Sequence, residues 1–422
     1  MAAIKLLKRN KFDITLTCLE TLDEATKKEL GDIKIYDGGH PMELLDIPYK
    51  FIVKNPGIPY FVPFIKEAVK RNFKIITEIE LGYMYSDNVY LAITGTNGKT
   101  TTTQLVYELV KSSFENTFLA GNIGTPLCDV VLDHPRQNYI VMEVSSFQLM
   151  GCYKFRPYVS TIMNLSPDHL DYNETLEEYY LSKTSIYKQQ DQYGYFIRNL
   201  DDANVETFVK DVPATELTLS MHDENADIHT KDGYIIYKDE KVMRIKNIKL
   251  IGDHNIYNVM FAIAYAKIVN VSNKTIDQVV SNYVGVPYRL ENVGEDKDKN
   301  IVYYNDSKST SADSTLTALK AFDKKKVVLI LGGKDKGLDY KELIDYINEH
   351  KNIVSVLSFG EIKDAFKECS KNKTFDTLYE LMTYVKDNYK KVNVLFSPAT
   401  SSFDQYENYE ARGEHFNSLV KL

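Results

Sequence analysis

The segment from Asn88 to Val110 joins a strand, a glycine turn and a helix, and it constrains the fold more than any other part of the sequence. It reads NVYLAIT, then GTNG, then KTTTTQLVYELV. The first part is rich in β-branched and apolar residues, which favours a buried strand. The last part spaces its apolar residues at helical intervals. A strand that leads into a helix through a glycine turn is typical of a parallel α/β sheet.

The glycine turn also predicts a phosphate-binding loop. In the standard pattern a glycine stands five positions before the Gly-Lys pair, but Ile93 occupies that position here and the first glycine is Gly95. The amides and dipole of a helix N-terminus attract anions, Lys99 can reach outer phosphates, and the Thr100 hydroxyl can bind magnesium. The alternative is a plain turn before a helix. A Gly-Lys-Thr sequence directly after a strand favours nucleotide binding.

The rest of the chain repeats the alternation of short apolar runs and helical stretches, so we predict an α/β protein throughout. A length of 422 residues suggests two or three domains. The charged, alternating segment 214–251 is interpreted as a set of antiparallel hairpins. Domain boundaries are predicted near Thr77 and near Val286 and Pro287. The predicted strands are 88–94, 139–144, 158–163, 327–331, 354–359 and 392–396.

Charge and cysteine content exclude several classes of function. Lys and Arg total 51 against 59 Asp and Glu, a net charge of -8, which opposes a nucleic-acid partner. The four cysteines form no C-x-x-C pair, which is typical of reduced thiols in the cytoplasm. No apolar run approaches the roughly 20 residues of a membrane helix. We therefore predict a cytoplasmic protein with no nucleic-acid or membrane partner; we also expect a monomer, and the small-molecule substrates are those implied by the resemblance described below.

Acidic residues follow two further strands of the predicted sheet. Glu143 ends an apolar strand, where a carboxylate is either a ligand or lies on an exposed edge. Asp168, His169 and Asp171 follow the next strand. Taken alone, that loop would be a solvated turn, but together with Glu143 it predicts a magnesium site beside the phosphate loop.

Six motifs, in order along the chain, resemble those of the Mur ligases, whose loop is TGTNGKTT. They are TGTNGKTT at 94–101, AGNIG at 120–124, EVSSFQL from Glu143, NLSPDHLDY from Asn164, GDHNIYN from Gly252 and YNDSKST from Tyr304. Two more segments, LGGKDKG at 331–337 and SPATSSFDQYENYEARG at 397–413, are similar to the members that add D-glutamate to UDP-N-acetylmuramoyl-L-alanine. The resemblance extends from about Asp46 to the C-terminus.

The resemblance implies an ATP-dependent amide ligase that works through an acyl phosphate in peptidoglycan precursor synthesis. It implies three domains. Residues 1–78 would be a Rossmann-like domain that binds the UDP substrate, and 79–286 an ATP-binding domain with a mainly parallel sheet plus a small antiparallel sheet. Residues 287–422 would be a Rossmann-like domain that receives the amino acid.

Site residues carried over from the family fall into four groups. The ATP phosphates would be held by Gly95, Thr96, Asn97, Gly98, Lys99, Thr100 and Thr101, and the rest of the nucleotide by Asn255, Arg289 and Asp306. Two magnesium ions are implied, one on Thr100 and Glu143, the other on His169 and a carbamylated Lys183. The D-glutamate side and reacting centre would involve Lys308, Thr310, Lys336, Ser402 and Tyr409. The UDP-N-acetylmuramoyl-L-alanine side would involve Asn55, Gly57, Asn122 and Gln148.

Some of these residues have a plain structural interpretation from the sequence alone. Lys183 would be a solvated lysine on a helix, and Tyr409 and Gln148 would be packing or loop residues. Ser311 stands where similar members tend to have Asn, which leaves the glutamate contact there open.

The first residues depart from the family, because the chain opens on a helical stretch with no glycine before Gly31. We expect a missing strand and glycine turn there, through a shortened gene model or a different mode of binding, and weak substrate binding as a result. The alternatives are a folylpolyglutamate synthetase-like ligase, a catalytically impaired nucleotide-binding homologue, or a GTPase-like switch. The last is disfavoured because Asn273-Lys274-Thr275-Ile276 lacks the acidic residue that reads guanine.

Overall fold

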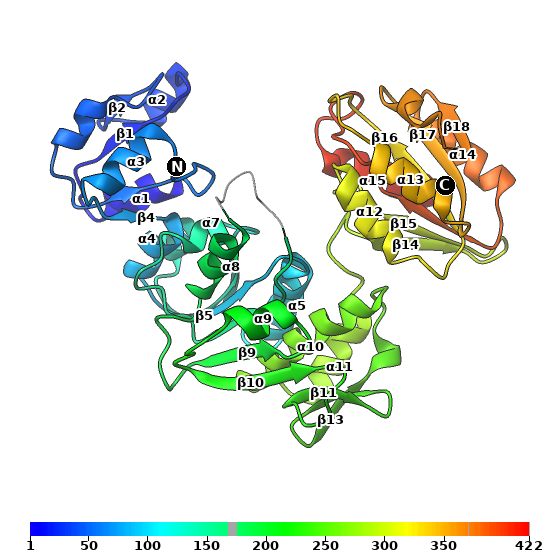
Figure 1. Cartoon of the computed structure of the whole chain (residues 1–422), viewed down its shortest axis with the longest axis horizontal. Coiled ribbons are helices and arrows are strands. Elements are labelled where there is room, and N and C mark those ends of the chain that lie inside the picture. The colour runs from blue at the N-terminus through cyan, green and yellow to red at the C-terminus, as the bar shows by residue number, and fades with distance from the viewer. Residues whose placement is uncertain (168–174, 370, 422) are drawn as a thin grey trace. The chain divides into compact units, whose positions relative to one another are not determined.

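The computed structural model describes residues 1–167, 175–369 and 371–421, and it is a mixed α/β structure (Figure 1). The chain forms two compact units, Met1–Ile248 with Ile256–Ser281 and Lys249–Asn255 with Asn282–Leu422. The predicted α/β class is confirmed, while the division into three functional domains stays a prediction. No helix within the described ranges is long and apolar enough to cross a membrane.

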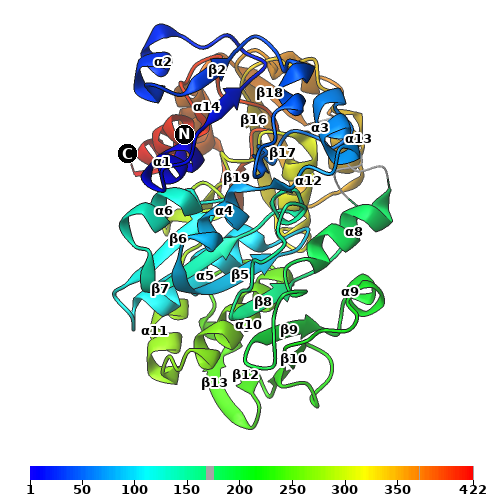
Figure 2. The same cartoon turned by 90° about the vertical axis from the view of Figure 1, so that its left-hand side faces the viewer.

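A nine-stranded sheet organises the first unit, in the order β13-β12-β11-β10-β9-β8-β5-β7-β6 (Figures 1 and 2). All neighbours from β6 to β11 are parallel, and only β11, β12 and β13 pair antiparallel. The strands are β5 Asp87–Thr94, β6 Thr117–Gly121, β7 Arg136–Glu143, β8 Val159–Ile162, β9 Tyr195–Asn199, β10 Thr215–Ser220, β11 Ile228–Lys231, β12 Tyr234–Tyr237 and β13 Glu240–Arg244.

The hairpins predicted for 214–251 therefore lie at β11–β13, but two details differ from the prediction. They extend the parallel sheet at its edge instead of forming a small sheet of their own. Moreover, β10 pairs parallel with β9, through Thr215 opposite Tyr195. The alternating pattern indicates strands with one exposed face, and such a pattern does not specify strand direction.

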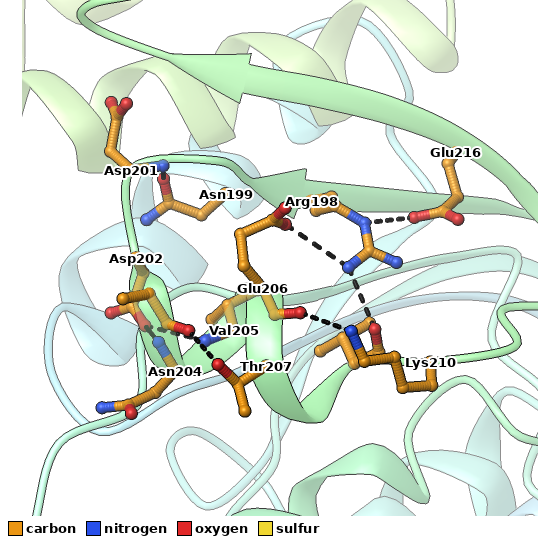
Figure 3. A network of polar contacts seen from close by, with 12 residues as sticks. Arg198, Asn199, Asp201, Asp202, Asn204, Val205, Glu206, Thr207, Lys210 and Glu216 are labelled. Carbon is orange, nitrogen blue, oxygen red and sulfur yellow. Dashed lines mark hydrogen bonds and ion pairs between the residues drawn. The ribbon is translucent and has the colours of Figure 1, made fainter.

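Helices cover both faces of this sheet. Ile140 and Met142 of β7 share a core with Leu127 and Val131 of α6, whereas α5 contacts β5, β6 and β7. Arg198 of β9 pairs with Glu206 and Glu216, as Figure 3 shows, and so ties α9 to the strands. The helices are α5 Lys99–Lys111, α6 Leu127–Asp133, α7 Ser146–Leu149, α8 Leu176–Thr184, α9 Ala203–Phe208, α10 Asp253–Ile268 and α11 Asn273–Asn282, with the short η2 Ile245–Asn247.

The residues before Asp87 contain short strands and helices that also belong to the first unit. Their described strands pair as two separate parallel ladders, β1 with β2 and β3 with β4, rather than as one Rossmann-like sheet. Helix α1 packs against α4 and α6. The elements are α1 Ala2–Arg9, β1 Thr15–Thr17, α2 Glu24–Leu30, β2 Lys34–Tyr36, η1 Met42–Asp46, β3 Ile52–Val53, α3 Pro63–Lys70, β4 Ile75–Ile76 and α4 Glu78–Met84.

The second unit is a six-stranded sheet in the order β14-β15-β19-β16-β17-β18, parallel except for the β14–β15 pair. Along β16, Leu329 packs with α12 and α13, while Val328 and Ile330 pack with α14 and α15, so helices cover both faces. The elements are β14 Glu291–Asp296, β15 Ile301–Asn305, α12 Ala312–Lys320, β16 Val327–Gly332, α13 Lys341–Glu349, β17 Ile353–Phe359, η3 Lys363–Phe366, β18 Asn372–Phe375, α14 Leu378–Asn388, β19 Val392–Phe396 and α15 Tyr409–Lys421.

Candidate active site

Four neighbouring strands of the nine-stranded sheet, β8, β5, β7 and β6, end at one edge of the first unit. The phosphate loop follows β5, Glu143 ends β7, and Asn122 follows β6. In open α/β sheets, ligands bind outside the carboxyl ends of the strands. The sequence predicts that residues of these segments bind phosphate and metal. Those that the structure describes lie together at the edge of the sheet where ligand binding is expected.

The phosphate loop has the strand, turn and helix that the sequence predicts. Gly95 and Gly98 have φ angles of 151° and 82°, and Gly98 is the left-handed N-cap of the 13-residue helix α5. The ammonium of Lys99 donates to the carbonyl oxygens of Gly95 at 3.0 Å and Thr96 at 2.8 Å. Lys99 therefore folds back over the loop, where it can meet an anion held by the first amides of the helix.

Glu143 is a buried carboxylate, and only one of its two oxygens accepts a hydrogen bond from the described residues. It is 2% exposed and lies opposite Ile93 in the β5–β7 ladder, next to the start of the loop. Its Oε1 accepts from Asn122 Nδ2 at 2.7 Å, while Oε2 is buried without a hydrogen-bond partner among the residues that the structure describes. A buried carboxylate oxygen without a donor is costly, and a magnesium ion is a suitable partner for it.

Lys183 lies on α8 and is 1% exposed, so the interpretation of it as a solvated lysine is wrong. Its ammonium sits 4.5 Å from the ring centroid of Tyr179. The loop with Asp168, His169 and Asp171 lies outside the described residues. Within residues 1–167, 175–369 and 371–421, no group of three or more His, Cys, Asp and Glu side chains could hold a metal ion.

A second set of site candidates lies at the strand ends of the six-stranded sheet. Asp306 follows β15 and is 2% exposed. Its Oδ2 accepts from Ser397 Oγ at 2.7 Å and its Oδ1 accepts from the amide of Leu290 at 3.1 Å. Burial raises the pKa of Asp306 to about 6, because desolvation outweighs these donors and the nearby Arg289 charge.

Arg412 of α15 is a buried residue that the sequence reasoning missed. Its guanidinium donates to Ser307 Oγ at 3.1 Å, to the Ser307 carbonyl at 2.9 Å and to the Gly332 carbonyl at 3.1 Å. It thereby joins the ends of β15 and β16. Burial lowers the pKa of Arg412 to about 10. The local sequence, an arginine among charged residues on a helix, indicates a solvated residue, so no local signal pointed to it.

Most of the remaining candidates of this unit lie on the segments that follow β15, β16 and β19. The Lys308 ammonium is 5.8 Å from the ring centroid of Tyr409, and burial raises the pKa of Tyr409 to about 12. Ser402 is buried, whereas Lys336 is exposed on the loop after β16. Thr310 is half-buried and Arg289 is exposed, while Asn255 donates from Nδ2 to the Ile251 carbonyl at 2.6 Å.

Comparison with known proteins identifies the family of the chain. A family model described as the Mur ligase middle domain matches residues 93–266. The UDP-N-acetylmuramoylalanine--D-glutamate ligase of Geobacillus sp. (strain WCH70) is 37% identical, over 99% of this chain and 94% of that one. The chain belongs to the Mur ligase family. The protein of the same name from Staphylococcus haemolyticus is 38% identical, over 98% of this chain and 92% of its own length.

Solved Mur ligase structures share the fold at low sequence identity. The Thermotoga maritima MurF ligase in complex with ADP has a TM-score of 0.61 at 18% identity and covers 88% of this chain and 94% of that one. The Acinetobacter baumannii UDP-N-acetylmuramoylalanyl-D-glutamyl-2,6-diaminopimelate--D-alanyl-D-alanyl ligase has a TM-score of 0.60 at 17% identity and covers 81% and 77%. These likenesses show the fold alone.

Two polar residues that the Mur ligase resemblance places on the acyl substrate also have structural bonds in this chain. Asn122 holds Glu143 by its side chain, and its amide donates to the Glu143 carbonyl at 2.8 Å. Gln148 closes a capping box with Ser145 at the start of α7. Their substrate contacts stay predictions, and the structure adds a role for each in holding the strand ends.

The loop after β3, which carries Asn55 and Gly57, is also held from within. The amide of Gly57 donates to Asn55 Oδ1 at 2.9 Å. The buried ammonium of Lys54 donates to the carbonyls of Asn55, Pro56 and Ile58 at 3.1, 3.3 and 2.6 Å. Burial lowers the pKa of Lys54 to about 8. The sequence reasoning did not single out Lys54, because a lysine after a short strand carries no local sign of burial.

Proposed function

We propose that this chain joins D-glutamate to UDP-N-acetylmuramoyl-L-alanine and converts ATP to ADP and phosphate, in peptidoglycan precursor synthesis. The observation that carries the proposal is the 37% identity, over 99% of the chain, to a relative that bears this activity as its name. Nucleotide binding is supported by the loop and helix at Gly95–Lys111, and by the Thermotoga maritima MurF ligase of the same fold, which was solved in complex with ADP.

The proposed reaction must activate a carboxylate, which is a poor electrophile. Transfer of the terminal phosphoryl group of ATP to the alanine carboxylate would give an acyl phosphate, which the amine of D-glutamate would attack with loss of phosphate. Lys99, whose ammonium lies over the phosphate loop, would offset the negative charge where two anions meet. The chain's tasks would be positioning and charge stabilisation, because the nucleophile is the substrate's own amine.

Magnesium, when bound, would neutralise charge on the transferring phosphoryl group. Thr100 and Oε2 of Glu143, which has no donor within residues 1–167, 175–369 and 371–421, fit one ion. A second ion would use His169 and a carbamylated Lys183. The burial of Lys183 supports that proposal, since carbamylation replaces a buried ammonium with an oxygen ligand. Intact-protein mass spectrometry at two bicarbonate concentrations would detect the adduct, and Lys183→Ala should lack it and turn over far more slowly.

The two substrates would bind through residues of different strand ends and loops. We propose Asn55, Gly57, Asn122 and Gln148 on the side of UDP-N-acetylmuramoyl-L-alanine. Lys308, Thr310, Lys336, Ser402 and Tyr409 would serve D-glutamate, and Asn255, Arg289 and Asp306 the nucleotide.

Phosphate release from ATP tests the proposal. The full chain is assayed with UDP-N-acetylmuramoyl-L-alanine and D-glutamate, singly and together, and L-glutamate serves as the matched control. We expect sustained release only when both substrates are present, and only with the D isomer. Release that ignores D-glutamate would overturn the proposal.

A further inference from the structure

The phosphate loop is bonded to the segment that follows β8, through one uncharged side chain. Asn164 Oδ1 accepts from the amides of Thr96 at 3.1 Å and Asn97 at 2.8 Å. Asn164 Nδ2 donates to the carbonyl of Asn97 at 3.0 Å, and the Thr96 amide also reaches the Asn164 carbonyl at 3.0 Å. One asparagine therefore forms hydrogen bonds with the backbone of two consecutive loop residues, as a neighbouring strand would.

A second pair of bonds reinforces this link. The amide of Ser166 donates to Thr96 Oγ1 at 3.1 Å, and Thr96 Oγ1 donates to the Ser166 carbonyl at 3.2 Å. Asn97 Nδ2 adds a longer bond to Ser166 Oγ at 3.4 Å. Both central residues of the glycine turn are thus joined to the segment 164–166.

The two glycines of the loop also lie in close contact with residues outside the loop. A Cβ at Gly95 would lie 3.1 Å from Met163 Cβ and 3.3 Å from the Asn164 nitrogen. A Cβ at Gly98 would lie 2.4 Å from Asn258 Oδ1 of α10. The loop is therefore held between the end of β8 and α10, and its conformation is determined by neighbours outside the β5–α5 connection.

We propose that Asn164 is a positioning residue for nucleotide binding, because it holds the phosphate loop in its anion-binding shape. The amides of Thr96 and Asn97 donate to Asn164, so they are not the donors for phosphate. A phosphate would instead meet the first turn of α5, from Lys99 onward, whose amides have no acceptors within the helix. This inference rests on the proposed nucleotide binding, and it deepens it by assigning the anion to the helix end of the loop.

The test measures the dissociation constant of ADP by isothermal titration calorimetry, with the full chain and without the other substrates. Asn164→Ala removes three side-chain bonds to the loop, and we expect affinity to fall by about tenfold or more. Asn138→Ala is the matched control. Its Nδ2 donates to Asn88 Oδ1 at 2.9 Å and to the Arg136 carbonyl at 2.6 Å, at the opposite end of β7 from Glu143. We expect this control to bind ADP as the wild type does.

A second variant separates positioning from mere folding. Asn164→Asp keeps both acceptor bonds but loses the donor to Asn97 and, when ionised, places a negative charge beside the phosphate loop. Because both loop amides stabilise the ionised form, the new carboxylate stays charged at neutral pH, and its ADP affinity should be lower than that of the wild type by a ratio that narrows as salt screens the repulsion. Unchanged ADP affinity in a folded Asn164→Asp or Asn164→Ala protein would overturn the proposal.

The proposed ligase function stands or falls separately. If the wild type releases phosphate only with both substrates and Asn164→Ala binds ADP normally, only the inference about Asn164 is wrong. Tight ADP binding that depends on Asn164, without release driven by D-glutamate, would sink only the ligase proposal.

Discussion

Glu143 and Asp306 are buried carboxylates at the strand ends of the two sheets, both 2% exposed, yet the protein treats them differently. Asp306 accepts hydrogen bonds on both oxygens, from Ser397 and Leu290. Glu143 accepts one from Asn122, and its second oxygen is buried without a donor in the described part of the chain. A carboxylate whose two oxygens both accept hydrogen bonds from the protein holds strand ends together, whereas an oxygen without a donor is available to a ligand.

Arg412 extends the comparison on the side of the second unit. Three nitrogens of its guanidinium donate hydrogen bonds to Ser307 and Gly332. Burial lowers the pKa of Arg412 because the charge is desolvated. We infer that Asp306 and Arg412 first serve the fold of their unit, and that Glu143 first serves the ligand. Each prediction below tests one side of this contrast.

The largest effect is expected for Glu143→Gln, which removes the charge and keeps the shape. Turnover with both substrates should fall by about a thousandfold, because a metal ligand would be lost at the transferring phosphate. The urea midpoint of unfolding should change little, since the bond from Asn122 can persist. Glu115→Gln, at an exposed glutamate of the same unit, is the control and should keep full activity. A stable variant that keeps its activity would contradict the contrast.

Arg412→Met should have the opposite profile, with a large loss of stability. Removing three charged hydrogen bonds leaves the buried Ser307 and Gly332 carbonyls without this donor, at a cost of about 3 to 5 kcal/mol. Arg198→Met is the comparison, since Arg198 pairs with the more exposed Glu206 and Glu216 (Figure 3). Surface pairs of this kind contribute about 1 kcal/mol or less. Urea unfolding followed by circular dichroism gives both values, and equal losses would break the contrast.

The smallest effect is a pH dependence of stability that comes from Asp306. Burial raises its pKa from 3.8 to about 6, so the folded chain binds this proton more tightly than the unfolded chain. The stability it contributes is fully present below pH 3.8 and is lost as the pH rises through about 6. Between pH 5 and pH 7 the wild type should lose about 1 kcal/mol relative to Asp306→Asn. Unfolding curves with the same pH slope would contradict the raised pKa.

Much of the strand structure of both units could be predicted from the sequence, because its signals are local. The strand, turn and helix around Gly95 and Gly98 follow from residue types at short spacing. The six predicted strands are confirmed, since each is an apolar run of a length typical of buried strands. The direction of β10 was less accessible, because an alternating pattern is the same in a parallel and an antiparallel edge.

The missed residues are those whose partners lie far away in the sequence. Arg412 bonds to Ser307 and Gly332, and Asn164 bonds to Thr96 and Asn97. The burial of Lys183, which the sequence alone indicated to be solvated, escaped for the same reason, since its helix carries Glu177 and Glu178 before it. A residue's neighbours in the chain do not report which side chains surround it after folding, so none of these environments had a sequence signal.

By itself, the sequence determined the α/β class, the phosphate loop and the family, because these depend on local periodicity and on ordered motifs. Only the tertiary structure decided which buried polar groups form hydrogen bonds within the protein and which remain available to a ligand. That distinction depends on how many hydrogen-bond donors surround a buried carboxylate. In the described residues, both oxygens of Asp306 have a donor, whereas Oε2 of Glu143 has none. Such convergence is created when strands distant in sequence become neighbours in a sheet.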